Sequence, residues 1–203
     1  MAEPLEAAYK ARLPLLEGLC SRLETEVHEL LGGLHHIDRI CFRVKSPKSF
    51  TEKALDPENQ PPYSAPLREV EDQVAGRVIV FFLSDMKPIV DQVRTAFTVV
   101  ERTKRRPARD EEFGYESEHL ICIIPPHVKP ATWNTHDEMP ATIEIQVRTI
   151  FMHAYAEPQH DLGYKASREL SRQAKRELAW IAASSWGADQ AFDRLLHSLE
   201  SED

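Results

Sequence analysis

The sequence has few cysteines, no long apolar run and no excess of positive charge. Its 3 cysteines lie far apart without a CxxC pair, which excludes a disulfide framework and gives no zinc or redox motif. The longest apolar run, residues 78–83, is too short to span a membrane, and the acidic N-terminus lacks the pattern of an export signal. A net charge of -8 argues against a surface devoted to nucleic acid. We therefore expect a cytoplasmic protein with a local anion site and no membrane partner.

A chain of 203 residues is long enough for one compact domain with its own core. Apolar residues at three- and four-residue spacing predict an amphipathic helix over residues 3–31, kinked near Pro14. The rest of the chain mixes strands, helices and loops, which indicates an α/β or α+β fold with helices flanking a sheet. In the first half of the chain we expect an extended segment at 35–45, a short helix at 47–54, a loop at 56–66, a strand at 76–83 and a helix at 85–99. A basic, turn-rich loop follows. We then expect a strand at 119–124, a loop at 127–140, a strand at 141–148, and helices at 149–161 and 166–198.

A group of hydrogen-bond donors lies at the predicted junction of the extended segment and the short helix. Converging cations and the free N–H groups of a helix N-terminus suit a polyphosphate. The alternative is a solvated charged face, and spacing alone does not separate the two interpretations. The donors are Arg43, Lys45, Lys48, Ser49 and Lys53.

An acidic turn at residues 69–72 precedes the strand that is expected to begin at Gly76 and Arg77. Mg²⁺ in proteins is usually held by one or two carboxylates and by substrate phosphates, so a carboxylate at a strand edge is a reasonable ligand. Taken alone, an acidic stretch of this kind is more often only a turn.

The strand expected at residues 141–148 has one apolar and one polar face. Its odd-numbered residues from 143 to 147 are apolar, whereas Glu144, Gln146 and Arg148 point to the other face. With the acidic turn, this face would supply what phosphoryl transfer requires: two carboxylates for a metal ion, and cations for the moving phosphates. A strand with one wet face is also common without any catalytic role.

Two shorter motifs contain an aromatic residue or a histidine. Gly114 lets the backbone approach a ligand, and Tyr115 could stack on a base, although a tyrosine in this setting is more often part of the core. On the helix expected at 149–161, His153 and Glu157 lie one turn apart, but no third residue completes a zinc site of known spacing.

These motifs occur in the order found in the synthetase domain of the RelA/SpoT family, which the chain resembles over residues 35–165. Residues 43–53 are similar to the family's ATP-binding segment, and residues 72–77 are similar to the segment with its magnesium aspartate. Residues 114–119 are similar to its acceptor-nucleotide loop, and residues 144–149 are similar to its catalytic glutamate strand. Residues 160–165 are typical of its small members. The resemblance implies a mixed β-sheet of the nucleotidyltransferase type flanked by helices. It also implies an N-terminal helix in residues 1–34, a C-terminal helical segment in residues 166–203 and no hydrolase domain.

The resemblance further implies an enzyme that transfers the β,γ-pyrophosphate of ATP to the 3′-hydroxyl of a second nucleotide and releases AMP. In that reaction Asp72 and Glu144 are the catalytic residues and the Mg²⁺ ligands, and Glu144 is also placed to activate the hydroxyl. The residues implied for ATP binding are Arg43, Lys45, Ser49, Lys53 and Arg77, and those for acceptor binding are Tyr115, His119, Gln146, Arg148, Arg105 and Arg106.

The segment before Gly114 departs from the family pattern. Synthetases of guanosine tetraphosphate and pentaphosphate commonly have lysine and asparagine there, whereas residues 109–113 of this chain read Arg-Asp-Glu-Glu-Phe. Three acids would repel a diphosphate unless Lys104, Arg105, Arg106 and Arg109 face it.

We expect GDP or GTP as the acceptor. The alternative is a toxic small synthetase that modifies the 3′ end of tRNA or makes adenosine alarmones. A second copy of the chain, packed through the terminal helices, and an antitoxin are further candidate partners. A catalytically silent nucleotide sensor is the alternative from another class, but a sensor would not need both Asp72 and Glu144.

Overall fold

The computed structural model describes residues 2–59, 61–109, 111–165 and 170–201, without the side chains of residues 160, 161 and 163–165. Its strands form one mixed sheet in the order β1-β2-β5-β4-β3. β2 and β5 run parallel, and the other neighbouring pairs run antiparallel. The strands are β1 (Ile37–Val44), β2 (Val74–Val80), β3 (Val99–Arg105), β4 (Ser117–Ile123) and β5 (Thr142–Thr149).

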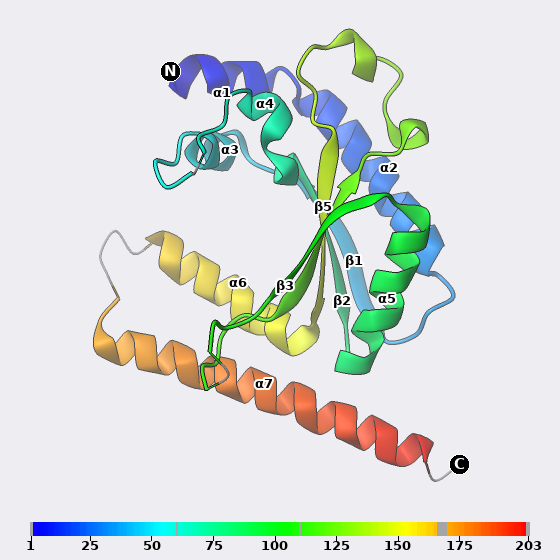
Figure 1. The fold of residues 1–203 in the computed structure, drawn as a ribbon, viewed down its shortest axis with the longest axis vertical. Coiled ribbons are helices and arrows are strands. Elements are labelled where there is room, and N and C mark those ends of the chain that lie inside the picture. The colour runs from blue at the N-terminus through cyan, green and yellow to red at the C-terminus, as the bar shows by residue number, and fades with distance from the viewer. Residues whose placement is uncertain (1, 60, 110, 166–169, 202–203) are drawn as a thin grey trace.

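Helices lie on both sides of this sheet (Figure 1). α2 and α5 cover one side, and α6 lies on the other side next to the long helix α7. None of the helices in the described part of the chain is long and apolar enough to cross a membrane. The helices are α1 (Ala2–Lys10), α2 (Leu13–Leu31), α3 (Pro47–Ala54), α4 (Pro66–Glu69), α5 (Leu83–Ala96), α6 (Ile150–Lys165) and α7 (Arg172–Glu200), with 3₁₀ turns at Glu71–Gln73, Pro126–Val128 and Trp133–Thr135.

The main core lies between the sheet and α2. In α2 the buried side chains, among them Leu16 and Leu19, recur at the predicted three- and four-residue spacing. Ile143, Ile145 and Val147 of β5 are fully buried in the same core. Successive residues of a strand point to opposite faces, so the polar residues between them face the side of α6. The predicted two-faced strand is confirmed.

Gly76 allows the edge strand β1 to pair closely with β2. Phe42 of β1 lies opposite Gly76, and a Cβ atom at this position would collide with the Phe42 ring. Any other residue directly before Arg77 would force the Phe42 ring to move.

The prediction of a basic, turn-rich loop before residue 119 was wrong for residues 99–105, which form the edge strand β3, whereas residues 106–109 and 111–116 belong to neither a helix nor a strand. Most side chains of β3 are exposed, so the strand lacks the apolar alternation by which strands are recognised. Charged residues on an edge strand discourage pairing with another chain, which accounts for Glu101, Arg102 and Lys104 at this position.

Two other boundaries differ from the prediction. The helix expected over residues 3–31 consists of α1 and α2, and Pro14 lies in the first turn of α2, where its fixed φ angle is tolerated, rather than at a kink. β2 begins at Val74 and ends at Val80, and Leu83 is already the first residue of α5. Residues 166–169 of the expected C-terminal helix lie outside the described residues.

Candidate active site

A buried aspartate lies between two lysines at one end of the polar sheet face. Asp72 is in the 3₁₀ turn before β2, Lys45 follows β1, and Lys53 belongs to α3. Lys45 Nζ is 2.7 Å from Asp72 Oδ2, and Lys53 Nζ is 3.0 Å from Asp72 Oδ1. The fold therefore brings two of the predicted ATP-binding lysines to the predicted metal ligand.

The two lysines keep Asp72 ionised. Burial raises the pKa of Asp72, but the charges and hydrogen bonds of Lys45 and Lys53 outweigh burial and hold it below its ordinary value. Asp72 in turn raises the pKa of Lys53 against the effect of burial. A bound polyphosphate would replace Asp72 as the partner of the two lysines, and a bound cation would replace the lysines as the partner of Asp72. All of these side chains are already charged before a ligand binds.

Two other predicted ATP-binding donors lie on the elements next to Lys45, α3 and β1. The Ser49 N–H donates to Ser46 Oγ at 3.2 Å, which caps the N-terminus of α3. Arg43 is exposed on β1, opposite Ala75 of β2. Lys48 Nζ lies 3.9 Å from Glu52 Oε1 on an exposed part of α3.

Glu144 lies at the centre of the sheet, opposite Ala75 of β2 and Ile121 of β4. Its Oε1 is 2.6 Å from His119 Nδ1, and its Oε2 accepts a hydrogen bond from Gln146 Nε2 at 2.8 Å. Burial raises the pKa of Glu144, but the hydrogen bond and charge of His119 lower it by more than burial raises it. The pKa of Glu144 therefore lies below its ordinary value. Glu144 is thus an ionised carboxylate held in one orientation.

Asp72 and Glu144 face the same small cavity, which has a volume of about 90 Å³ and is also lined by Lys53, Arg105 and His119. No group of three or more His, Cys, Asp or Glu side chains that could hold a metal ion occurs among residues with described side chains. Mg²⁺ needs only one or two carboxylates where substrate phosphates and water complete its coordination. The two carboxylates fit such a shared magnesium site.

Glu157 of α6 joins two arginines of neighbouring strands. Arg77 Nη1 of β2 and Arg148 Nη2 of β5 each lie 2.8 Å from Glu157 Oε1. A carboxylate oxygen between two guanidinium groups takes the place that a phosphate oxygen can occupy. The sequence indicates Glu157 only as a candidate metal ligand, because this pairing is created by the parallel register of β2 and β5.

Tyr115 is half-buried and contacts two other predicted acceptor-binding residues. Its ring packs edge-on against His119 with 6.1 Å between centroids, and the Arg148 guanidinium lies 5.7 Å from its centroid. The ring also packs against the cluster of Met152, Tyr155 and Ala182. Tyr115 therefore contributes to a small core and also lines a cavity that could hold a ligand.

A cavity of about 560 Å³ lies beside Tyr115 and is also lined by Arg106, Glu111, Glu112 and Phe113. Arg106 is the only cation among its described lining residues. This cavity is the candidate acceptor site, and its charge balance is acidic.

The basic residues before Gly114 do not face one ligand together, which corrects the idea that four cations gather there. Lys104 points to the opposite sheet face, where its Nζ lies 3.3 Å from Glu118. Arg109 is paired with Glu112. Of these four cations, Arg105 lines the carboxylate cavity and Arg106 lines the Tyr115 cavity, and both also border a cavity on the opposite sheet face. Asp110 lies outside the described residues.

The sequence that carries this site matches a known family. Residues 42–169 match the model described as the region found in RelA / SpoT proteins. This chain belongs to the RelA/SpoT family. The side chains of the family-like segment 160–165 are described only in part, so its expected role stays a prediction.

Two relatives from Bacillus subtilis (strain 168) are similar over most of their lengths. The chain is 31% identical to GTP pyrophosphokinase YjbM over 164 residues, which are 78% of this chain and 72% of that protein. It is 26% identical to GTP pyrophosphokinase YwaC over 171 residues, which are 84% of this chain and 78% of that protein.

The crystal structure of small alarmone synthetase 1 from Bacillus subtilis matches the RelA/SpoT chain with a TM-score of 0.78 and 21% identity. The match covers 95% of this chain and 98% of that chain. At this identity the likeness concerns the fold, and it confirms the predicted mixed sheet flanked by helices.

Proposed function

We propose that this RelA/SpoT family member transfers the β,γ-pyrophosphate of ATP to the 3′-hydroxyl of GDP or GTP and releases AMP. The single observation that carries the proposal is the shared cavity of Asp72 and Glu144 with cations on its wall. Family membership and the names of the two relatives, both GTP pyrophosphokinases, support the same pyrophosphotransferase class.

The proposed reaction forms one bond and breaks one. The acceptor's 3′-oxygen attacks the β-phosphorus of ATP, and the bond from that phosphorus to the oxygen of the α-phosphate breaks, so AMP leaves with the bridging oxygen. Glu144 is ionised and oriented by His119 and Gln146, and it accepts the proton of the 3′-hydroxyl. Lys45 and Lys53 stabilise charge that develops on the phosphates.

Asp72 and Glu144 are the residues that would hold Mg²⁺. When bound, the ion would supply charge neutralisation for the phosphates next to both carboxylates. For the remaining ATP contacts we propose Arg43, Ser49 and Arg77, as the sequence predicted.

For the acceptor we propose stacking of the base on Tyr115, with Arg148, Gln146 and His119 next to it. Arg105 and Arg106 are the cations placed to reach the acceptor's phosphates or those of ATP.

One observation favours a second acceptor. The cavity beside Tyr115 contains Glu111 and Glu112 and a single cation, Arg106, among its described lining residues, which disfavours a free 5′-diphosphate. The 3′ end of tRNA has no diphosphate at its terminal ribose and would avoid this repulsion.

An acceptor panel distinguishes these alternatives. The full chain is incubated with Mg²⁺, γ-labelled ATP and GDP, GTP, AMP, ATP or deacylated tRNA, and the products are separated by chromatography. The proposal predicts labelled product with GDP or GTP. Efficient labelling of tRNA, with no product from GDP or GTP at millimolar concentration, would contradict it and establish the second acceptor.

Replacement of Arg105 and Arg106 by alanine tests the same point through charge. With a free nucleotide as acceptor, the double variant should raise the acceptor's KM and show a shallow salt dependence, as should the wild type. With tRNA, each lost phosphate contact should reduce the slope of log affinity against log salt by about 0.7 to 0.9.

The expected second copy of the chain, the antitoxin and the cytoplasmic location stay predictions.

A further inference from the structure

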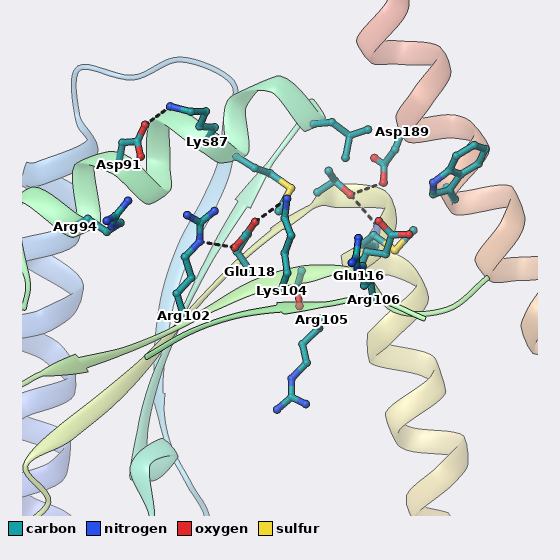
Figure 2. Close-up of a pocket in the computed structure, with 16 residues that line it drawn as sticks. Lys87, Asp91, Arg94, Arg102, Lys104, Arg105, Arg106, Glu116, Glu118 and Asp189 are labelled. Carbon is teal, nitrogen blue, oxygen red and sulfur yellow. Dashed lines mark hydrogen bonds and ion pairs between the residues drawn. The ribbon is translucent and has the colours of Figure 1, made fainter. Parts of the chain in front are cut away.

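Another cavity lies on the sheet face opposite the two carboxylates. It has a volume of about 680 Å³ and is enclosed by α5, β3, β4 and α7 (Figure 2). Glu118 of β4 lines it, whereas the next residue, His119, points to the other face and contacts Glu144. A ligand in this cavity is therefore separated from Glu144 by the sheet itself.

Cations gather along one side of this cavity. In Figure 2, the side chains of Arg102 and Lys104 converge on Glu118, whereas Arg105 points away from the other lining residues. Six cationic and four acidic residues line the cavity, in a chain whose net charge is -8. The cations on its rim are Lys87, Arg94, Arg102, Lys104 and Arg106.

The inner wall has two buried polar atoms without a partner in the described part of the chain. Asp189 of α7 is 1% exposed, and its Oδ2 accepts a hydrogen bond from Thr149 Oγ1 at 2.7 Å, but its Oδ1 has no partner. Ser117 is 3% exposed, and its Oγ also has none. Buried polar atoms are normally hydrogen-bonded, so these two atoms can each take a hydrogen bond from a ligand with N–H or O–H groups.

Apolar side chains complete the wall next to these atoms. Met86, Met152 and the indole of Trp186 line the cavity, and Trp186 is 39% exposed. An aromatic ring and thioether side chains suit a flat heteroaromatic ring. The cavity thus has a cationic rim for phosphates and an apolar inner part with hydrogen-bond acceptors.

We propose that this cavity binds a purine nucleotide at a site separate from the active site. The phosphates lie at the cationic rim, the base packs against Trp186, and a ring N–H of the base donates to Asp189 Oδ1. Guanine is preferred to adenine, because guanine has both a ring N–H and an amino group on one edge, whereas adenine has only the amino group.

Calorimetric titration of the full chain with GTP, without ATP and therefore without turnover, tests this site. We expect the Lys87→Ala/Arg94→Ala variant to lose affinity about tenfold at one site, while the kcat and acceptor KM of pyrophosphate transfer stay unchanged. Lys10→Ala/Arg22→Ala removes the same charge from α1 and α2 and should bind like the wild type. Tyr115→Ala should weaken only the other site.

A second pair of measurements tests the base. Asp189→Asn should weaken GTP binding at this site and leave the binding of inorganic pyrophosphate unchanged, and ATP should bind more weakly than GTP. The proposal is overturned if Lys87→Ala/Arg94→Ala binds GTP like the wild type, or if pyrophosphate binds as tightly as GTP. If GTP is not the acceptor, the wild type binds one GTP, and Lys87→Ala/Arg94→Ala still weakens it, so failure of the proposed reaction can be distinguished from failure of this site.

Discussion

His119 Nδ1 and Glu144 Oε1 lie 2.6 Å apart on neighbouring strands of the sheet. Both side chains are largely buried, and His119 Nε2 has no hydrogen-bond partner among the described residues. The imidazole therefore serves mainly to orient and charge-stabilise Glu144. We infer that His119 is a positioning residue for the proposed base.

Removal of this imidazole should slow the proposed reaction more than it weakens substrate binding. His119→Ala should reduce kcat by about 10- to 100-fold, as is typical when the partner of an active-site ligand is lost, with a smaller change in the acceptor's KM. His119→Asn keeps an N–H donor near the same place and should lose less. Steady-state kinetics checks this, and equal kcat values for wild type and His119→Ala would show that the contact does not matter.

The two carboxylates should be needed for activity far more than for folding. Asp72→Asn and Glu144→Gln should each reduce pyrophosphate transfer by at least about 100-fold, because each removes a metal ligand or base. Thermal unfolding should shift by only a few degrees, since both residues border the small cavity rather than the main core. Activity within tenfold of wild type in both variants would exclude the assignment.

Most of the active-site face could be predicted from the sequence because one strand carried the signal. The alternation of β5 separates core from site, and this alternation is local in sequence. The partners of Glu144 and Arg148 could not be predicted in the same way. His119 reaches Glu144 and Glu157 reaches Arg148 only through strand register and helix placement, which are long-range properties.

Substitutions of Tyr115 distinguish a role in stacking on the acceptor base from a role in the protein core. Stacking on a base is worth about 1 to 3 kcal/mol, so Tyr115→Ala should weaken acceptor binding by about 5- to 150-fold, and Tyr115→Phe should restore most of it. Acceptor KM and thermal melting are measured together. Loss of folding in Tyr115→Ala, or an unchanged acceptor KM, would mean that the contacts with Met152 and Tyr155 are its only role.

Asp189 should make stability depend on pH. Burial, with smaller contributions from Glu116 and Asp193, raises the pKa of Asp189 to about 6, although the Thr149 hydrogen bond lowers it in part. The folded state therefore holds a proton that the unfolded chain releases, so this stability is complete below the ordinary pKa of 3.8 and is lost as pH rises through about 6.

Asp189→Asn stays neutral at every pH. Its melting temperature relative to wild type should rise between about pH 4 and pH 7 and then stay constant. Thermal melts across this range measure the difference, and Asp56→Asn, on an exposed loop, is the matched control. A difference that does not change with pH would contradict the raised pKa.

The edge strand β3 shows where sequence reasoning fails for a physical reason. Charge conceals the period of two in its residues, so the sequence predicts a loop, yet this strand divides the cations between two faces. Arg105 reaches the carboxylate cavity, whereas Arg102 and Lys104 reach Glu118 on the other side. The acceptor segment could therefore not be assessed from a count of basic residues.

The fate of the individual phosphates of ATP tests the central claim most directly. ATP labelled at either the α- or the γ-phosphate is incubated with GDP, GTP and Mg²⁺, and the labelled products are identified by chromatography and mass. Pyrophosphate transfer predicts the γ-label on the guanine nucleotide and the α-label in AMP, with both signals lost in Glu144→Gln. Release of ADP with the γ-label on the acceptor, or transfer of the α-label, would contradict it.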